Sequence, residues 1–200
     1  ARIYLTNYAV DAVYDAQGNY VSGSILEYVT VEYAGAGDVG AVTVQSSSPG
    51  LTHVKVHDSR YQGISIVTDN APIQRISNCE IWNIYQGASA GALGLSVSTG
   101  GRLISGNYLR DCAAEGMVLG AACSVTDNTI AGIGGRGVYV GGSNSTLTGN
   151  TIAGNGGGGV DVSGSNCTLT GNTITGNTQV YSAGGIYVPG SNCTLTRNTI

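Results

Sequence analysis

The sequence predicts an all-β fold, a right-handed single-stranded parallel β-helix of about eight coils, each 21–28 residues long with three strands. Three observations predict it. Short segments repeat along the C-terminal half, aliphatic residues recur at the repeat spacing along the whole chain, and glycine precedes one strand of nearly every coil. A repeat of 20 to 50 residues is typical of solenoids, in which each unit buries its core only against its neighbours.

The repeats are clearest in residues 123–200. Closely similar segments occupy 145–152, 167–174 and 193–200, and the first of them reads Ser-Thr-Leu-Thr-Gly-Asn-Thr-Ile. Equivalent asparagines follow one another at 22, 22 and 26 residues, namely Asn128, Asn150, Asn172 and Asn198. A variable period predicts coils that share one core geometry and differ in the length of a corner.

The same spacing extends into the divergent coils of residues 1–122, so residues 1–200 are expected to form one β-helix domain, a segment of a longer chain or of a filament. The first expected strand of each coil carries an aliphatic column: Leu26, Leu51, Ile76, Ile104, Val125, Leu147, Leu169 and Leu195. The second carries another, five residues further on: Val31, Val56, Ile81, Leu109, Ile130, Ile152, Ile174 and Ile200. Positions that are aliphatic at every level predict the interior of the solenoid.

A third strand completes each coil, and alternation turns two aliphatic residues of it inward. The pairs are Val42/Val44, Ile64/Ile66, Leu95/Val97, Met117/Leu119, Val138/Val140, Val160/Val162 and Ile186/Val188. Residues 2–5 have the same pattern at the start of the chain. Glycine precedes six of these strands, where we expect either a positive φ or a close backbone approach: Gly63, Gly94, Gly116, Gly137, Gly159 and Gly185.

The asparagine column predicts amides that are stacked and hydrogen-bonded along the solenoid axis, as in cross-β ladders. Asparagine also tolerates the left-handed backbone conformation, which a corner needs. In the earlier coils we expect Val29, Val54 and Cys79 to take its place.

Composition narrows the range of functions. The net charge is −4, charged residues make up 10% of the chain, and only one lysine is present, so a phosphate-binding basic surface is not expected and nucleic acid is an unfavoured partner. No apolar run reaches the roughly 18 residues of a membrane span, so membrane insertion is not expected either. We expect no cofactor and no metal site, because no Cys-x-x-Cys spacing occurs and His53 and His57 stand alone as histidines.

The Gly-[Val/Ile]-x-Val and Leu-Thr-x-Asn-Thr-Ile elements resemble the right-handed parallel β-helix repeat proteins, the superfamily that includes pectate lyases and many bacterial surface proteins. The resemblance implies an extracellular or cell-surface location. For an enzyme of this superfamily it also implies an acidic polysaccharide substrate, with clustered carboxylates beside an arginine or lysine. The matching motifs are structural positions only, so no catalytic residue is assigned.

A candidate binding face lies on the early coils, where charged and aromatic residues follow the second strand and corner insertions gather. Loop insertions on one face of a solenoid often form its binding surface. Aromatic rings with planar polar neighbours suit glycans, so we nominate Glu32, Tyr33, His57, Arg60, Tyr61, Trp82, Tyr85, Gln86, Arg110 and Tyr181. Asp38 and Gln179 lie on the same inserted corners. The competing interpretation is a solvated column of Glu32, His57, Trp82 and Arg110, held by an ion pair and a cation–π contact.

The five cysteines leave two interpretations open. Cys167 and Cys193 are neighbours across one coil step, close enough for a disulfide. A column that alternates Cys123, Ser145, Cys167 and Cys193 also suits small buried side chains, and free buried thiols are the favoured interpretation.

Function is predicted as a non-catalytic stalk, adhesin or filament module that binds glycans on its early coils and associates end to end through open coil ends. The alternative is a polysaccharide lyase or glycoside hydrolase. A minor alternative is ice binding, because Thr146, Thr148 and their equivalents in the next two coils form outward threonine columns.

Overall fold

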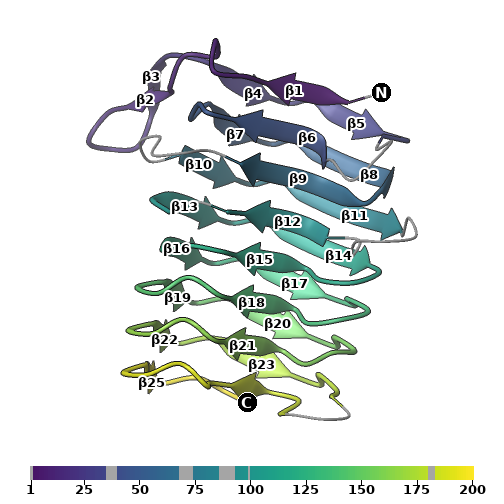
Figure 1. The fold of residues 1–200 in the computed structure, drawn as a ribbon, viewed down its shortest axis with the longest axis vertical. Coiled ribbons are helices and arrows are strands. Elements are labelled where there is room, and N and C mark those ends of the chain that lie inside the picture. The colour runs from purple at the N-terminus through teal and green to yellow at the C-terminus, as the bar shows by residue number, and fades with distance from the viewer. Residues whose placement is uncertain (1, 35–39, 68–73, 86–92, 99, 180–182) are drawn as a thin grey trace.

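The computed structural model describes residues 2–34, 40–67, 74–85, 93–98, 100–179 and 183–200. The chain is a right-handed parallel β-helix, an elongated rod with the two termini at opposite ends (Figure 1). Three parallel sheets run along it, with eight, eight and seven strands, which is about seven full turns and close to the eight predicted. Among the described residues no helix is long and apolar enough to cross a membrane.

Each sheet takes one strand from every coil, and we name the sheets by their first strands. The β1 sheet contains β1 (Ile3–Leu5), β6 (Gly40–Gln45), β9 (Gln62–Val67), β12 (Leu93–Val97), β15 (Met117–Leu119), β18 (Val138–Val140), β21 (Val160–Val162) and β24 (Ile186–Tyr187). The β4 sheet contains β4 (Ile25–Glu27), β7 (Gly50–Thr52), β10 (Gln74–Ser77), β13 (Arg102–Ser105), β16 (Cys123–Thr126), β19 (Thr146–Thr148), β22 (Thr168–Thr170) and β25 (Thr194–Thr196). The β5 sheet contains β5 (Thr30–Glu32), β8 (Lys55–Arg60), β11 (Glu80–Tyr85), β14 (Tyr108–Cys112), β17 (Thr129–Ala131), β20 (Thr151–Ala153) and β23 (Thr173–Thr175).

The strand pairing confirms the predicted columns. Leu26 pairs with Leu51, and the same column continues coil by coil to Leu195. The second column runs from Val31 to Ile174 in the same way. From Leu51 and Val56 onward to Leu169 and Ile174 these side chains are almost completely buried, so they form one continuous core.

The predicted asparagine ladder is present and extends one coil further than expected. Asn107, Asn128, Asn150, Asn172 and Asn198 are linked in series, each Nδ2 donating to the Oδ1 of the next at 2.9 Å. In the coil before Asn107 the backbone N–H of Cys79 donates to the Asn107 Oδ1. A second, shorter ladder, which was not predicted, joins Asn155 to Asn177 at 2.8 Å.

The prediction that the ladder asparagines adopt the left-handed conformation is wrong. The ladder asparagines do not have positive φ; the residue before each of them does, as at Asp127 (φ 53°) and Gly149 (φ 67°). The amide can therefore point into the interior while its neighbour turns the corner. A second group of asparagines, Asn144, Asn166 and Asn192, does adopt positive φ just before the β4-sheet strands.

The glycines that precede the β1-sheet strands are explained by close approach. None of the six has a positive φ. A Cβ on Gly116 would lie 2.5 Å from the carbonyl oxygen of Gly137, and one on Gly159 would lie 2.4 Å from Cγ2 of Ile174. Stacked coils thus touch through backbone at this corner, and a side chain has no room there.

A two-stranded antiparallel hairpin, β2 (Val13–Tyr14) and β3 (Tyr20–Ser22), interrupts the first coil and was not predicted. It lies beside the β4 sheet at the N-terminal end of the rod (Figure 1). All five cysteines are free thiols in the structure, in agreement with the favoured interpretation.

Candidate functional site

The predicted binding face lies on the outside of the β5 sheet. Strand pairing places Glu32 beside His57, His57 beside Trp82, and Trp82 beside Arg110. We call these four residues the outer ladder. Because side chains alternate along a strand, the buried Val31, Val56, Ile81 and Leu109 fix the ladder residues on the solvent side.

Ladder side chains contact one another along the rod axis. The imidazole of His57 stacks on the indole of Trp82, with centroids 4.3 Å apart and planes 13° apart. The guanidinium carbon of Arg110 lies 5.2 Å from the centre of the same indole, from the strand on the other side. His57 and Arg110 therefore cover the two faces of Trp82. Its indole N–H makes no hydrogen bond within the described part of the chain.

Carboxylates surround the basic groups of the ladder. His57 Nε2 lies 3.7 Å from Glu32, and its Nδ1 lies 2.7 Å from Asp58. Hydrogen bonds with His57 and Asn83 hold the pKa of the Asp58 carboxyl below its usual value. Arg110 lies 2.6 Å from Asp111. The ion pair and the cation–π contact of the competing interpretation are both present, so the ladder is largely satisfied by its own contacts.

Exposed tyrosines flank the ladder. Tyr33 is 71% exposed at the corner after β5, and Tyr85 is 47% exposed at the end of β11. Arg60 pairs in register with Tyr85, and its guanidinium lies 6.0 Å from the Tyr61 ring. Eight of the ten nominated residues are among the described residues, and they lie on β5, β8, β11 and β14 or at the corners that follow β5 and β8. Gln86 and Tyr181, and also Asp38, lie outside the described residues.

Two further groups of charged residues lie outside the outer ladder. Lys55 and Glu80 form a surface ion pair, 3.2 Å apart and about half exposed. In later coils, Arg136 joins Glu115 at 2.9 Å and Asp161 at 2.7 Å, and stacks 4.3 Å from the Tyr139 ring. Burial opposes the charge of Arg136, but its hydrogen bonds to the two carboxylates raise its pKa overall. The cluster was not predicted because its charged residues, Glu115, Arg136 and Asp161, come from three different coils.

The outward threonines lie in two rows on the β4 sheet. Pairing aligns Thr146, Thr168 and Thr194 in one row and Thr148, Thr170 and Thr196 in the other. The hydroxyls of Thr170 and Thr196 are 3.0 Å apart. No group of three or more His, Cys, Asp or Glu that could hold a metal ion occurs among the described residues.

Residues 120–200 match the family model described as right handed beta helix region. A comparison with curated proteins finds no match. Among solved structures the chain is similar to the crystal structure of the Dettilon tailspike protein, with 11% identity and a TM-score of 0.26. That alignment covers 86% of this chain and 61% of the other, and a likeness this distant supports no functional conclusion.

Proposed function

We propose that this right-handed parallel β-helix is a non-catalytic module of an extracellular or cell-surface protein, serving as a stalk, adhesin or filament subunit, and that it binds glycans over the outer ladder. The observation that carries the proposal is the in-register row of aromatic and planar polar side chains on β5, β8, β11 and β14. In the later coils the same sheet carries Ala131, Ala153 and Thr175 instead.

The contacts of the ladder define how a glycan would bind. The faces of Trp82 are covered by His57 and Arg110, so stacking against a sugar ring falls to the exposed rings of Tyr33 and Tyr85. Tyrosine suits this role because one ring offers an apolar face and a hydroxyl. The Glu32 carboxylate, 55% exposed, accepts hydrogen bonds from sugar hydroxyls, and the Trp82 indole N–H donates one.

Calorimetric titration with a panel of neutral and acidic polysaccharides tests the proposal. The variant Tyr33→Ala/Tyr85→Ala should bind at least about tenfold more weakly, since about 1.4 kcal/mol corresponds to tenfold. Tyr187→Ala is the matched control, because Tyr187 is 45% exposed on β24 of another sheet. Equal binding by the double variant and the control would refute the ladder as the site.

Assays for product release separate this proposal from its enzymatic alternative. A polysaccharide lyase or glycoside hydrolase should release shortened chains from the panel, whereas a binding module should bind them intact. Glycoside hydrolysis needs two carboxyl groups about 5 to 10 Å apart across the scissile bond. Release that is lost on substitution of Glu32 or Asp58 would establish the alternative.

Ice binding is a second candidate, favoured by the two threonine rows that strand pairing aligns on β19, β22 and β25. Threonine is also a good residue for any exposed strand, so the rows alone have a simpler explanation. A thermal hysteresis measurement decides: no hysteresis excludes ice binding.

If the chain is a filament subunit, its copies should associate end to end through the open coil ends. Unpaired strand edges are templates for pairing with another chain. Light scattering at several concentrations, with electron microscopy, should show rods that lengthen with concentration. A constant mass across the series would exclude a filament.

A further inference from the structure

The unpredicted hairpin forms one wall of a pocket against the β4 sheet. A turn joins β2 to β3, and the Asp15 carboxylate holds it by accepting from the backbone N–H groups of Gln17 at 3.0 Å and Asn19 at 2.7 Å. These bonds and one from the Asn19 amide lower the pKa of Asp15. The hairpin is therefore an ordered element that can hold a binding surface.

Contacts with the coil body fix the hairpin in place. Arg75, on β10, donates to the carbonyl oxygen of Gly18 at 3.0 Å and lies 4.6 Å from the centre of the Tyr14 ring. Just before the hairpin, the N–H of Ala12 donates to the carbonyl of Ser48 at 2.8 Å. The Tyr14 hydroxyl lies over Gly50, where a Cβ would come within 2.2 Å of it.

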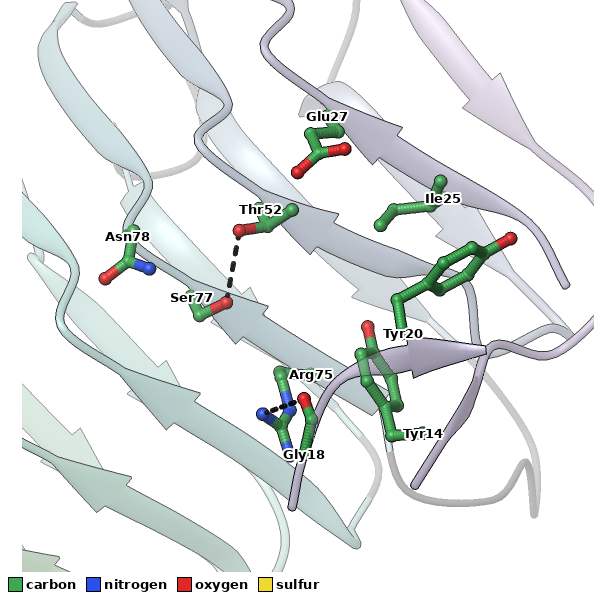
Figure 2. A pocket seen from close by; sticks show the side chains of 9 residues that line it. All are labelled: Tyr14, Gly18, Tyr20, Ile25, Glu27, Thr52, Arg75, Ser77 and Asn78. Atoms are coloured by element: carbon green, nitrogen blue, oxygen red, sulfur yellow. Dashed lines mark hydrogen bonds between the residues drawn. The ribbon is translucent and has the colours of Figure 1, made fainter. Parts of the chain in front are cut away.

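The space between hairpin and sheet is a pocket of about 270 Å³. We call it the hairpin pocket; it is lined by Tyr14, Gly18, Tyr20, Ile25, Glu27, Thr52, Arg75, Ser77 and Asn78. Figure 2 shows Tyr14 and Tyr20 on the hairpin side, with Glu27, Thr52 and Asn78 on the opposite side, along the sheet. The two tyrosine rings meet edge to face, with centroids 6.2 Å apart, and form an aromatic corner.

Several polar groups at this pocket have no hydrogen-bond partner within the described part of the chain. They are the Tyr14 hydroxyl, the Glu27 carboxylate and the Asn78 side-chain amide. The Arg75 Nε is buried and also lacks a partner. Thr52 and Ser77 add two hydroxyls, whose oxygens are 3.4 Å apart. The pocket thus presents both donors and acceptors beside aromatic carbon.

Size and charge narrow the ligand class. The pocket is slightly smaller than the roughly 300–1,000 Å³ of drug-sized sites, which suits a single six-membered ring. Arg75 already donates from Nη1 to Gly18, its guanidinium packs on the Tyr14 ring, and its unpartnered Nε is buried, whereas the Glu27 carboxylate is exposed and free. An anionic ligand would meet that carboxylate, but a sugar hydroxyl can donate to it.

We propose that the hairpin pocket binds one neutral pyranose residue, packed against the tyrosines and hydrogen-bonded through its hydroxyls to Tyr14, Glu27 and Asn78. The pocket opens to solvent, so the residue can be the end or a branch of a longer glycan. This site is on a different sheet from the outer ladder and does not depend on glycan binding there.

Titration with methyl glycosides of neutral hexoses, followed by amide chemical shifts and calorimetry, tests the proposal. Saturable shifts are expected at Tyr14, Thr52 and Ser77. Tyr14→Phe keeps the ring and removes the hydroxyl, and Glu27→Gln keeps the shape and removes the charge. Each should weaken binding about tenfold. Tyr187→Phe is the matched control, because Tyr187 is exposed on β24 at the other end of the rod, and it should leave binding unchanged.

Three results would overturn the proposal. They are no saturable binding of any neutral probe, unchanged affinity in both Tyr14→Phe and Glu27→Gln, and tighter binding of a methyl uronide than of the neutral sugars. Loss of binding in Glu32→Gln alone would place the glycan on the outer ladder, which would support the proposed function while removing this site. Unchanged thermal midpoints show that the variants are folded.

Discussion

The cysteines show how position decides the chemistry of a single residue. Cys79, Cys112, Cys123 and Cys167 are buried, whereas Cys193 is only partly so. Burial raises the pKa of Cys79 and Cys123 to about 11 and that of Cys112 to about 12. Because the thiolate is the reactive form, these three thiols are inert at neutral pH.

A thiol reagent at pH 8 should therefore modify Cys193 first and the buried cysteines only when the chain unfolds. The same pKa shifts should make the free energy of unfolding depend on pH. Folding raises the pKa of the buried thiols and so favours their protonated form. Their contribution to the free energy of unfolding is therefore complete below the unfolded pKa of about 8.5 and is lost as the pH rises toward 11–12.

Denaturant unfolding from pH 8 to 11 measures this loss. The variant Cys79→Ala/Cys112→Ala/Cys123→Ala is the control, and its stability should fall less steeply over that range. Rapid modification of all five thiols in the folded chain would contradict the buried arrangement.

At the scale of one element, the corner before each β1-sheet strand depends on the absence of a side chain. A Cβ on Gly137 would lie 2.6 Å from Cγ2 of Ile152 and 2.8 Å from the carbonyl oxygen of Gly159. The variant Gly137→Ala should lower the free energy of unfolding by about 1–3 kcal/mol, the usual cost of overpacking.

The control for this corner is Gly154→Asn. Gly154 has a φ of 65° and nothing within 4 Å of its added Cβ, and asparagine tolerates that conformation. Its cost should stay below about 1 kcal/mol in the same denaturant titration. Equal losses in the two variants would mean that backbone conformation, not space, selects glycine at position 137.

Periodic elements could be predicted from sequence, and unrepeated ones could not. Leu147 and Ile152 were placed correctly because seven other coils carry an aliphatic residue at the same level. The hairpin occurs once, so no column revealed β2 and β3, although Val13-Tyr14 and Tyr20-Val21 flank an Asp-Ala-Gln-Gly-Asn turn. The hairpin pocket was missed for the same reason, because packing joins Tyr14 to Arg75 across 61 positions (75 − 14).

The outer ladder illustrates a second limit of the sequence. Spacing alone placed Glu32, His57, Trp82 and Arg110 at one level, and strand pairing confirms it. Side-chain geometry then decides what the row can do, because His57 and Arg110 cover the faces of Trp82. A column predicts which residues are neighbours and does not predict which surface stays open.

In the whole molecule each coil contacts only its neighbours. A substitution in one coil should therefore destabilise the adjacent coils most and distant coils least. Asn150 bonds to both adjacent ladder amides, and its Nδ2 also donates to Val125 O at 3.0 Å. Asn150→Ala removes the partner of two buried groups, the backbone N–H of Asn128 and the carbonyl oxygen of Val125. It should cost about 2–6 kcal/mol, at about 1–3 kcal/mol per orphaned group.

Hydrogen exchange measures how far that defect spreads. Amides of β17 and β23, on either side of β20, should exchange faster in Asn150→Ala, and those of β7 and β8 should not change. Thr151→Ala is the control, since Thr151 is an exposed neighbour on β20. Uniform acceleration over all coils would show that the rod unfolds as a single cooperative unit instead.

The asparagine ladder also gives the rod an electrical direction. Every link has the same sense: each carbonyl oxygen accepts from the previous coil, while each amide nitrogen donates to the next. The side-chain dipoles therefore add head to tail along the axis, and each bond polarises the ones beside it. Two such rods lying side by side would lower their mutual electrostatic energy by pointing in opposite directions.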